Sequence, residues 1–201
     1  LLRYLDNVPD IVAFWATVAR SPEAFVGIMR LFANSQLLSS ILWRRPQLLV
    51  WLLEGALWAP PPAPALLAAE CAQLLACGES EGEVATTLRA FTQRHLLRIG
   101  ARDLCDLASV EETTADLSAL ADCVLQAGLE ACVRWLTARY GVPMYTDADG
   151  VQQPCGFCVI GMGKLGGYEL NFSSDVDLMY IYTSYEGSTS GLGANGRGQQ
   201  I

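Results

Sequence analysis

The sequence predicts an α+β protein, with an all-helical domain over residues 1–141 and the start of a smaller, strand-bearing domain over residues 142–201. Three observations predict this order. Apolar residues recur at helical spacing in the first part, between breaks made by proline and glycine. After Gly141 they form short runs between turn residues, as strands do. With 201 residues, 52% of them apolar, the chain can bury one sizeable core or two small ones.

The early helices are marked by local signals. Ser21-Pro22-Glu23 has the features of a helix start, with Ser as N-cap, Pro in the first turn and an acid at the positive end of the helix dipole. Trp43-Arg44-Arg45-Pro46 breaks the segment that follows, and Gln47 to Leu57 forms the next helix. The proline cluster from Pro60 to Pro64 predicts a stiff, extended connector.

A short helix over Ala65 to Ala76, ended by Gly78, precedes a basic helix over Glu83 to Ile99. The basic residues of this helix are Arg89, Arg94, His95 and Arg98. Such a run is typical of a solvated face, and the alternative is an arginine that reaches a phosphate or an acidic partner. His95 is the single histidine of the chain and has no apparent catalytic partner. We therefore interpret it as a structural residue.

The clearest helix begins at Ser109-Val110-Glu111-Glu112, which has the capping-box pattern, and it ends at Gly141 with Pro143 just beyond. Its apolar stripe comprises Leu117, Leu120, Ala121, Val124, Leu125, Leu129, Cys132, Val133 and Leu136. Spacing in steps of three and four predicts that this stripe is core, and the alternative is a surface for another domain.

Beyond Gly141, Asp147 to Gly150 predicts a turn and Gly156 to Ile160 a short apolar strand. A second strand is expected over Val176 to Tyr182. The tail from Ser184 to Ile201 is rich in Gly and Ser and is expected to be mobile. Because the first residues already resemble the interior of a helix and the last ones a loop, we expect the sequence to be a fragment of a longer chain.

Composition excludes several classes of function. The net charge is −8, with 13 Lys and Arg against 21 Asp and Glu, and an acidic surface repels nucleic acid. Seven cysteines, an odd number, indicate free thiols and a cytoplasmic protein. Cys155 and Cys158 form one C-x-x-C, but a zinc site would need a second ligand pair. Neither a transmembrane segment nor a signal peptide is apparent, so no membrane partner is expected.

The chemistry is concentrated between Gly161 and Tyr182. If Asp175 and Asp177 lie in a strand, alternation places both carboxylates on one face, where they repel one another unless a cation binds. This is the arrangement of a divalent metal site in nucleotidyl transfer, where Mg²⁺ is held by carboxylates and substrate phosphates.

A glycine-rich turn precedes the carboxylates. Its candidate nucleotide-binding residues are Gly163, Lys164, Gly166, Gly167, Ser173 and Ser174. Glycines remove side chains and leave backbone amides to face an anion, while the lysine supplies a cation and the serines supply hydroxyl groups. The segment is no Walker A loop, because Lys164 precedes the glycine pair. A phosphate-binding turn followed by a metal-binding strand favours a nucleotidyltransferase palm.

The stretch GMGKLGGYELNFSSDVDL resembles the signature of the glutamine synthetase adenylyltransferase family, the bifunctional bacterial enzymes that adenylylate and deadenylylate a tyrosine of glutamine synthetase. The resemblance extends to Arg94–Leu104, Leu117–Asp122 and Ala33–Gln36, and it covers the chain from about the first helix to Tyr182. It implies a polymerase-beta-like nucleotidyltransferase palm that regulates nitrogen assimilation, with Asp175 and Asp177 as catalytic ligands of Mg²⁺ or Mn²⁺. ATP or ADP would be substrate or product, and glutamine synthetase and a PII-type signalling protein would be the partners.

Met162 and Asn171 resemble the adenylyl-removing half of that family, which implies phosphorolysis of the adenylyl-tyrosine to ADP. Two alternatives remain: the ATP-dependent adenylylating half, and a regulatory module that binds a nucleotide without turnover. Gly167 stands where the wider superfamily often has Ser, and the gap to Asp175 is shorter than usual. A third metal carboxylate is expected beyond residue 201, so we expect the fragment alone to be inactive.

Overall fold

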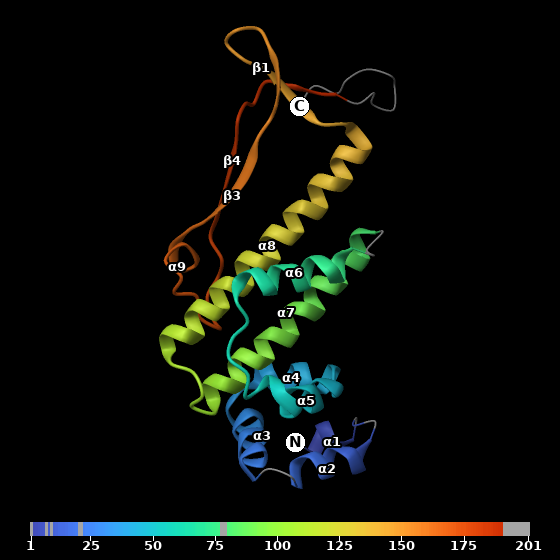
Figure 1. Cartoon of the computed structure of the whole chain (residues 1–201), viewed down its shortest axis with the longest axis vertical. Coiled ribbons are helices and arrows are strands. Elements are labelled where there is room, and N and C mark those ends of the chain that lie inside the picture. The colour runs from blue at the N-terminus through green and yellow to red at the C-terminus, as the bar shows by residue number, and fades with distance from the viewer. Residues whose placement is uncertain (1, 7, 9, 20–21, 77–79, 191–201) are drawn as a thin grey trace.

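The computed structural model describes residues 2–6, 8, 10–19, 22–76 and 80–190. The molecule is elongated, with the first helices at one end and the strands at the other (Figure 1). Two long helices, α7 (Glu81–Leu104) and α8 (Val110–Tyr140), run between the ends and pack against each other. The predicted order of helices first and strands second is therefore confirmed.

The helices that precede α7 and α8 are α1 (Leu2–Leu5), α2 (Ile11–Ala19), α3 (Pro22–Asn34), α4 (Gln36–Arg44), α5 (Gln47–Trp51), the π-helical turn η1 (Leu52–Ala56) and α6 (Pro64–Leu75). Residues 60–63 connect η1 to α6 without helix or strand, and Pro64, predicted as the end of this connector, is the first residue of α6. None of the described helices is by itself long and apolar enough to cross a membrane, and α3 and α4 meet that criterion only as a pair bent by 111°.

Capping residues account for several helix boundaries. Ser80 and Glu83 form a full capping box at the start of α7, and Ser109 accepts a hydrogen bond from the amide of Glu112 at the start of α8. Gly141, with φ of 85°, ends α8 in a backbone conformation that favours glycine. The predicted N-cap Ser21 and the predicted stop Gly78 lie outside the described residues.

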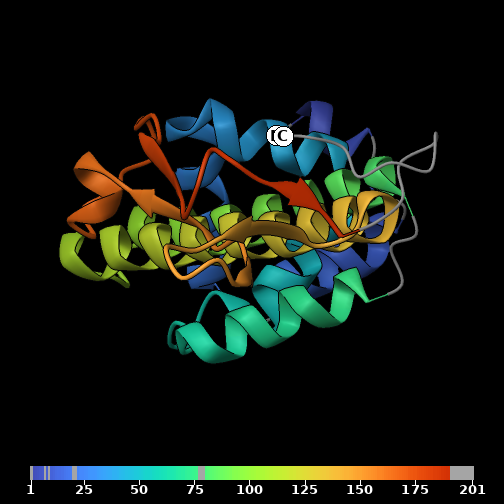
Figure 2. The same ribbon diagram turned by 90° about the horizontal axis from the view of Figure 1, so that it is seen from above.

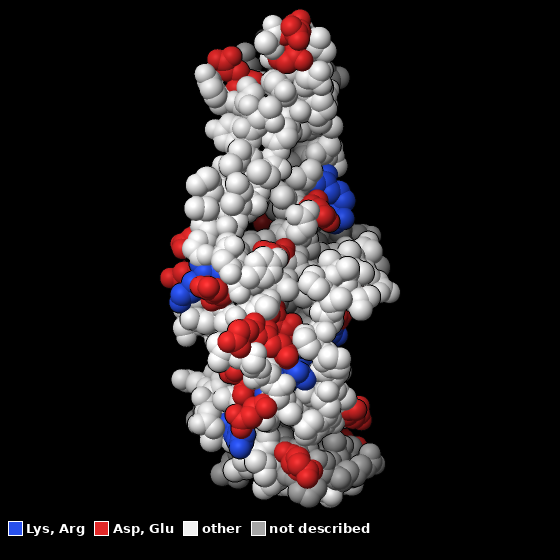
Figure 3. All heavy atoms as spheres, turned by 60° about the vertical axis from the view of Figure 1, so that its left-hand side comes forward, with Lys and Arg blue, Asp and Glu red and all other residues white. Residues whose placement is uncertain are grey.

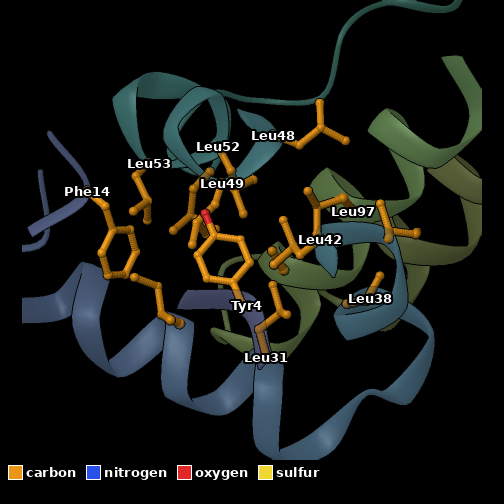
Figure 4. Packing of buried hydrophobic residues seen from close by; sticks show 14 of the residues in the cluster. Tyr4, Phe14, Leu31, Leu38, Leu42, Leu48, Leu49, Leu52, Leu53 and Leu97 are labelled. Carbon is orange, nitrogen blue, oxygen red and sulfur yellow. The ribbon is translucent and has the colours of Figure 1, made fainter. Parts of the chain in front are cut away.

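A first hydrophobic cluster forms the core of the N-terminal end (Figure 4). Tyr4, Leu42 and Leu49 are its most buried residues, from α1, α4 and α5, and Leu97 joins them from α7. The Tyr4 hydroxyl donates to the carbonyl of Pro46, so the one polar atom of this ring is satisfied. This cluster attaches the short helices to the first long helix.

A second cluster lies around α6, α7 and α8 and includes Leu67, Phe91 and Leu120. Leu165 and Leu170, from the segment that follows the first strands, are buried in it as well. From above, α7 and α8 run through the middle, with α6 on one side and strands on the other (Figure 2). The glycine-rich segment thus shares a core with the helices.

The apolar stripe of α8 is buried only in part. Leu117 and Leu120 are buried and Leu129 is half-buried, but Val133 and Leu136 near the end of the helix are 49% and 57% exposed. The prediction that the whole stripe is core is therefore wrong for its last turns. Helix α8 extends past α6, so the exposed apolar residues of its last turns have no element of the described chain packed over them.

The strands form two small antiparallel sheets. The first sheet has the order β2-β1-β5, from Gln152–Pro154, Pro143–Thr146 and Ser188–Thr189, and the second pairs β3 (Phe157–Gly161) with β4 (Leu178–Tyr182). The predicted turn at Asp147–Gly150 joins β1 and β2. The sequence predicted a mobile tail from Ser184 onward. In the structure, Ser188 and Thr189 of this tail pair with β1, and residues 191–201 lie outside the described residues.

Candidate functional site

The β3–β4 hairpin positions the glycine-rich segment and the two aspartates. Gly161 at the end of β3 pairs with Leu178 at the start of β4, and the amide of Met162 donates to the carbonyl of Asp177 at 2.9 Å. The helical turn α9 (Gly163–Gly166) begins directly after this bond. The backbone therefore brings Gly163 next to Asp177, although 13 residues separate them in the chain.

Two glycines of this segment have steric reasons to be glycine. A Cβ on Gly166 would lie 2.6 Å from the carbonyl oxygen of Gly161, so α9 can approach β3 this closely only without a side chain. Gly163 has φ of +53°, and a Cβ there would lie 3.2 Å from Oδ2 of Asp177. The space in front of Gly163 is thus filled by the carboxylate of Asp177.

Asp175 and Asp177 are both exposed, so their carboxylates are accessible from solvent. The sequence predicted that these aspartates lie in a strand. They precede it instead, because β4 begins only at Leu178. The correction has a physical cause: strand geometry needs partners on β3, and the pairing ends at Gly161 and Leu178. Alternation along a strand therefore does not fix the direction of Asp175.

The backbone amides of the turn are divided between structure and solvent. Those of Gly166 and Gly167 donate to the carbonyls of Met162 and Gly163, so the prediction that these two glycines leave free amides is wrong. The amides of Gly163, Lys164 and Leu165 belong to the first turn of α9, which has no intrahelical acceptor for them. The side chain of Lys164 is exposed beside them.

The Asn171-Phe172-Ser173-Ser174 segment is a self-bonded turn that leads into the aspartates. Asn171 Oδ1 accepts from the Ser173 amide at 3.0 Å and from the Ser174 hydroxyl at 2.9 Å. The Ser174 hydroxyl also accepts from the amide of Asn171. Ser174 thus has a structural role in this turn, whereas Ser173 is exposed.

Helix α8 holds the segment in place through residues that the site prediction missed. The Ser118 hydroxyl, fully buried, accepts from the amide of Leu170 at 3.2 Å. The Tyr168 hydroxyl donates to Oδ2 of Asp122 at 2.6 Å, and this hydrogen bond raises the pKa of Tyr168. Tyr168 has φ of +57°, which is unusual for a residue with a side chain. Their signal in the sequence was the Leu117–Asp122 stretch, which carried part of the family resemblance.

The basic helix, observed as α7, is not a solvated face. Arg98 and His95 are buried, and Arg98 Nη2 lies 3.0 Å from Oδ2 of Asp116 on α8. Arg94 pairs with Glu70 on α6. For Arg94 and Arg98, the alternative of an arginine that reaches an acidic partner is therefore the correct one. The prediction failed because residues on several faces of α7 contact α6, α8 or the short helices. Arg89 is exposed, as expected.

His95 is a neutral core residue in this structure. Its ring packs on Phe91, with ring centroids 4.5 Å apart, and Nε2 lies 3.3 Å from a carboxylate oxygen of Glu70. Burial, followed by the neighbouring charges of Arg94 and Arg98, lowers the pKa of His95 to about 3. This environment supports the structural interpretation of His95.

The described part of the chain lacks a convergent cluster of metal-ligating side chains. No group of three or more His, Cys, Asp or Glu side chains in that part is arranged to hold a metal ion. Cys155 is half-buried and Cys158 is exposed on β3, and both are free thiols. The carboxylates of Asp175 and Asp177 are thus the donor pair to consider.

Comparison with known proteins decides the family. The family model described as glutamate-ammonia ligase adenylyltransferase matches residues 25–199. The chain belongs to this family. Glutamate-ammonia ligase is another name for glutamine synthetase, so the resemblance identified from the GMGKLGG and DVD residues is confirmed.

Relatives in the adenylyltransferase family are similar over nearly the whole chain. Each of three is named bifunctional glutamine synthetase adenylyltransferase/adenylyl-removing enzyme. The protein of Thioalkalivibrio sulfidiphilus is 40% identical over 95% of this chain, that of Pasteurella multocida 34% over 94%, and that of Shewanella loihica 34% over 85%. The chain spans only 17% to 19% of the length of these relatives.

Proposed function

We propose that this chain is part of a nucleotidyltransferase that removes AMP from an adenylylated tyrosine of glutamine synthetase by phosphorolysis, giving ADP. The observation that carries the proposal is the position of the Asp177 carboxylate, 3.2 Å from where a Cβ of Gly163 would lie, near exposed Asp175, in a chain of the adenylyltransferase family. Met162 and Asn171, which resemble the adenylyl-removing half, support removal over addition. The surrounding strands would then be the start of a nucleotidyltransferase palm.

The residues present fit a divalent cation. Asp175 and Asp177 offer accessible carboxylate oxygens, the ligands that Mg²⁺ and Mn²⁺ prefer, and the missing side chain of Gly163 leaves room for one of them. Both aspartates would hold the ion. When bound, it would neutralise charge on phosphate oxygens and so favour nucleotidyl transfer.

The other residues of the turn would bind and orient the substrates. Lys164, exposed on α9, would attract the phosphates as a positive charge, and Ser173 would offer a hydroxyl group. In the reaction, an oxygen of inorganic phosphate attacks the α-phosphorus of the adenylyl group. The bond to the tyrosyl oxygen breaks, that oxygen takes up a proton, and ADP and free tyrosine side chain result. Gly166 would act by allowing the close approach of α9 to β3, and neither Gly166 nor Gly167 would donate its amide to the substrate.

The helical part would present this site to its protein partners in the cytoplasm. Glutamine synthetase would be the substrate, and a PII-type signalling protein would act as regulator. Exposed apolar residues near the end of α8, such as Val133 and Leu136, support an interaction role for the helices.

The test uses the full-length protein that contains this chain. We expect phosphate-dependent formation of ADP from adenylylated glutamine synthetase, and we expect Asp175→Asn and Asp177→Asn each to lower its rate at least roughly 100-fold, by analogy with the loss of other preorganised charge-stabilising groups. Asp149→Asn, at an exposed aspartate in the β1–β2 turn, is the matched control and should keep the rate.

Three outcomes would reject the proposal in different ways. ATP-dependent modification by this site, without phosphate-dependent removal, would assign the chain to the adenylylating half. Full activity in the double variant Asp175→Asn/Asp177→Asn would make the segment a non-catalytic nucleotide-binding module. Loss of activity in the Asp149→Asn control would show that the effect is not specific to the motif.

A further inference from the structure

A groove of about 380 Å³ lies where the helical part meets the turn before the two aspartates. It opens between the junction of α3 and α4, the last turns of α7 and the Asn171–Ser174 turn. Its lining includes Asn34, Gln36, Leu37, Asp103, Phe172 and Ser173. The volume is that of a small-molecule site rather than of a protein-docking surface.

The walls of the groove are fixed by packing and by hydrogen bonds. A Cβ on Gly100 would lie 2.6 Å from Cδ1 of Leu38, so α4 approaches α7 closely only because this residue is glycine. On the opposite wall, the hydrogen bonds between Asn171 and Ser174 hold Phe172 and Ser173 in place. The groove is therefore formed before any ligand enters.

The polar side chains of the groove combine one carboxylate with groups that can both donate and accept. Thr113 Oγ1 donates to Oδ1 of Asp103 at 3.2 Å, which orients the half-buried carboxylate. Asn34 Nδ2 donates one of its two N–H groups to the carbonyl of Arg30 at 2.8 Å, which leaves the other N–H and Oδ1 of this amide for a ligand. Gln36 adds an exposed amide that can both donate and accept.

The charge of the groove disfavours a phosphate. In the described part of the chain, no Lys or Arg lines it, and Asp103 repels anions. Phe172 and Leu37, 36% and 44% exposed, offer apolar surface for a flat ring. These groups suit a nucleoside. The carboxylate can accept from its ribose hydroxyls, the amides can bond to its ring nitrogens, and the aromatic ring can stack on its base.

We infer that this groove binds the nucleoside part of the nucleotide, with ribose hydroxyls donating to Asp103 and the base lying against Phe172 and Leu37. Ser173 lines the groove and is two residues from Asp175, so the phosphates of the same nucleotide can extend toward the aspartates. This assignment rests on the proposed function for the identity of the ligand. It divides the site into a compartment for the uncharged nucleoside and a compartment for the charged phosphates.

The experiment measures binding of adenosine and of AMP, with a metal chelator present, by saturation-transfer NMR and calorimetry. We expect saturable binding of adenosine that inorganic phosphate does not displace. Asp103→Asn should weaken it about tenfold or more through the loss of a charged acceptor. Phe172→Leu should weaken it by about the same factor through the loss of stacking.

Matched variants control for surface and folding effects. Phe157→Leu, at a phenylalanine that is 48% exposed on β3, and Asp149→Asn should leave the affinity for adenosine unchanged. Asp103→Asn keeps an oxygen that can accept from Thr113, and its circular dichroism should match that of the unmodified chain. If Asp103→Asn unfolds, Gln36→Ala, at an exposed position of the same groove, replaces it in the binding measurement.

The inference is overturned if adenosine shows no saturable binding, or if the groove variants bind it as tightly as the two controls do. It is also overturned if phosphate displaces adenosine, or if tyrosine amide binds in place of adenosine with the same sensitivity to Asp103→Asn. Turnover in the full-length protein is a separate readout. If the groove variants turn over at the wild-type rate and keep the wild-type KM for the nucleotide, this inference is contradicted and the proposed function is not. Persistent turnover in Asp175→Asn/Asp177→Asn contradicts the proposed function alone.

Discussion

Glycines that look alike in the sequence have different roles at the scale of single residues. Gly166 lies where a Cβ would contact a backbone carbonyl oxygen at 2.6 Å, whereas at Gly167 the nearest atom would be 3.6 Å away. Gly167 has φ of −86°, which any residue can adopt. The pattern of glycines could be read from the sequence, but only the approach of α9 to β3 shows which of them is required.

Gly166→Ala should destabilise the protein by about 1–3 kcal/mol, because the new methyl group must push α9 away from β3. Gly167→Ala is the matched control and should be neutral or stabilising by up to roughly 1 kcal/mol, since alanine reduces the freedom of the unfolded chain. Urea denaturation of both variants measures the difference. Equal effects of the two substitutions would show that the contact with Gly161 is not limiting.

His95 gives a prediction on pH. Its pKa is lowered to about 3 in the folded protein, against an ordinary value of about 6.5 in the unfolded chain, so only the unfolded chain takes up this proton between those values. Stability from this group is complete above about pH 6.5 and is lost as the pH falls toward 3. Within that window the slope should be about 1.4 kcal/mol per pH unit.

The variant His95→Gln isolates this contribution. It cannot titrate, so its stability should fall less steeply with acid than that of the unmodified protein, even if it is less stable at neutral pH. Denaturant unfolding at a series of pH values measures the difference in slope, and carboxylates common to both proteins cancel in the comparison. Parallel curves for the two proteins would mean that His95 is protonated in the folded state as well.

At the scale of elements, local signals predicted helix boundaries and non-local contacts decided the rest. Ser109 and Gly141 delimit α8 as expected, because caps act within a turn of the chain. The burial of Arg98 depends on α8 and could not be read from the periodicity of α7. The pairing of Ser188 with Met144 likewise depends on residues far apart in sequence. For the same reason the sequence could not show that Asp175 and Asp177 precede β4.

The buried pair of Arg98 and Asp116 joins the two long helices. Burial raises the pKa of Asp116 more strongly than the charge of Arg98 lowers it, so the carboxylate depends on its partner. Arg98→Met should therefore cost about 3–5 kcal/mol, because it leaves an uncompensated buried charge. Arg98→Met/Asp116→Leu should recover most of this loss. A double-mutant cycle in urea measures the coupling, and strictly additive losses would contradict it.

At the scale of the whole molecule, charge and apolar surface are unevenly distributed. In the view of Figure 3, acidic side chains gather in the middle and lower parts of the molecule and at its upper tip, and the stretch between the tip and the middle is largely uncharged. Phe157, Tyr180 and Tyr182 on the β3–β4 hairpin are all about half exposed or more. A two-stranded hairpin of this kind is marginal by itself, so its order depends on the contacts that tie it to the helices.

Those contacts predict that the helices and the glycine-rich segment unfold together. Leu165 and Leu170 are buried among residues of α6, α7 and α8, and the Leu170 amide is bonded to Ser118. Leu170→Ala should lower the free energy of unfolding by about 2–5 kcal/mol and shift the transition of the whole chain.

Two sets of probes on the same samples test this coupling. Tryptophan fluorescence reports on Trp43 and Trp51 in the helical part, and hydrogen exchange reports on the amides of Met162 and Gly166 in the segment. We expect coincident transitions in the unmodified chain and an equal shift of both in Leu170→Ala, because one core serves both parts. Leu66→Ala, at a leucine that is 67% exposed on α6, should shift neither. If the segment loses protection while the helical transition stays in place, the two parts are separate folding units, and the aspartates are then held by their own hairpin rather than by α8.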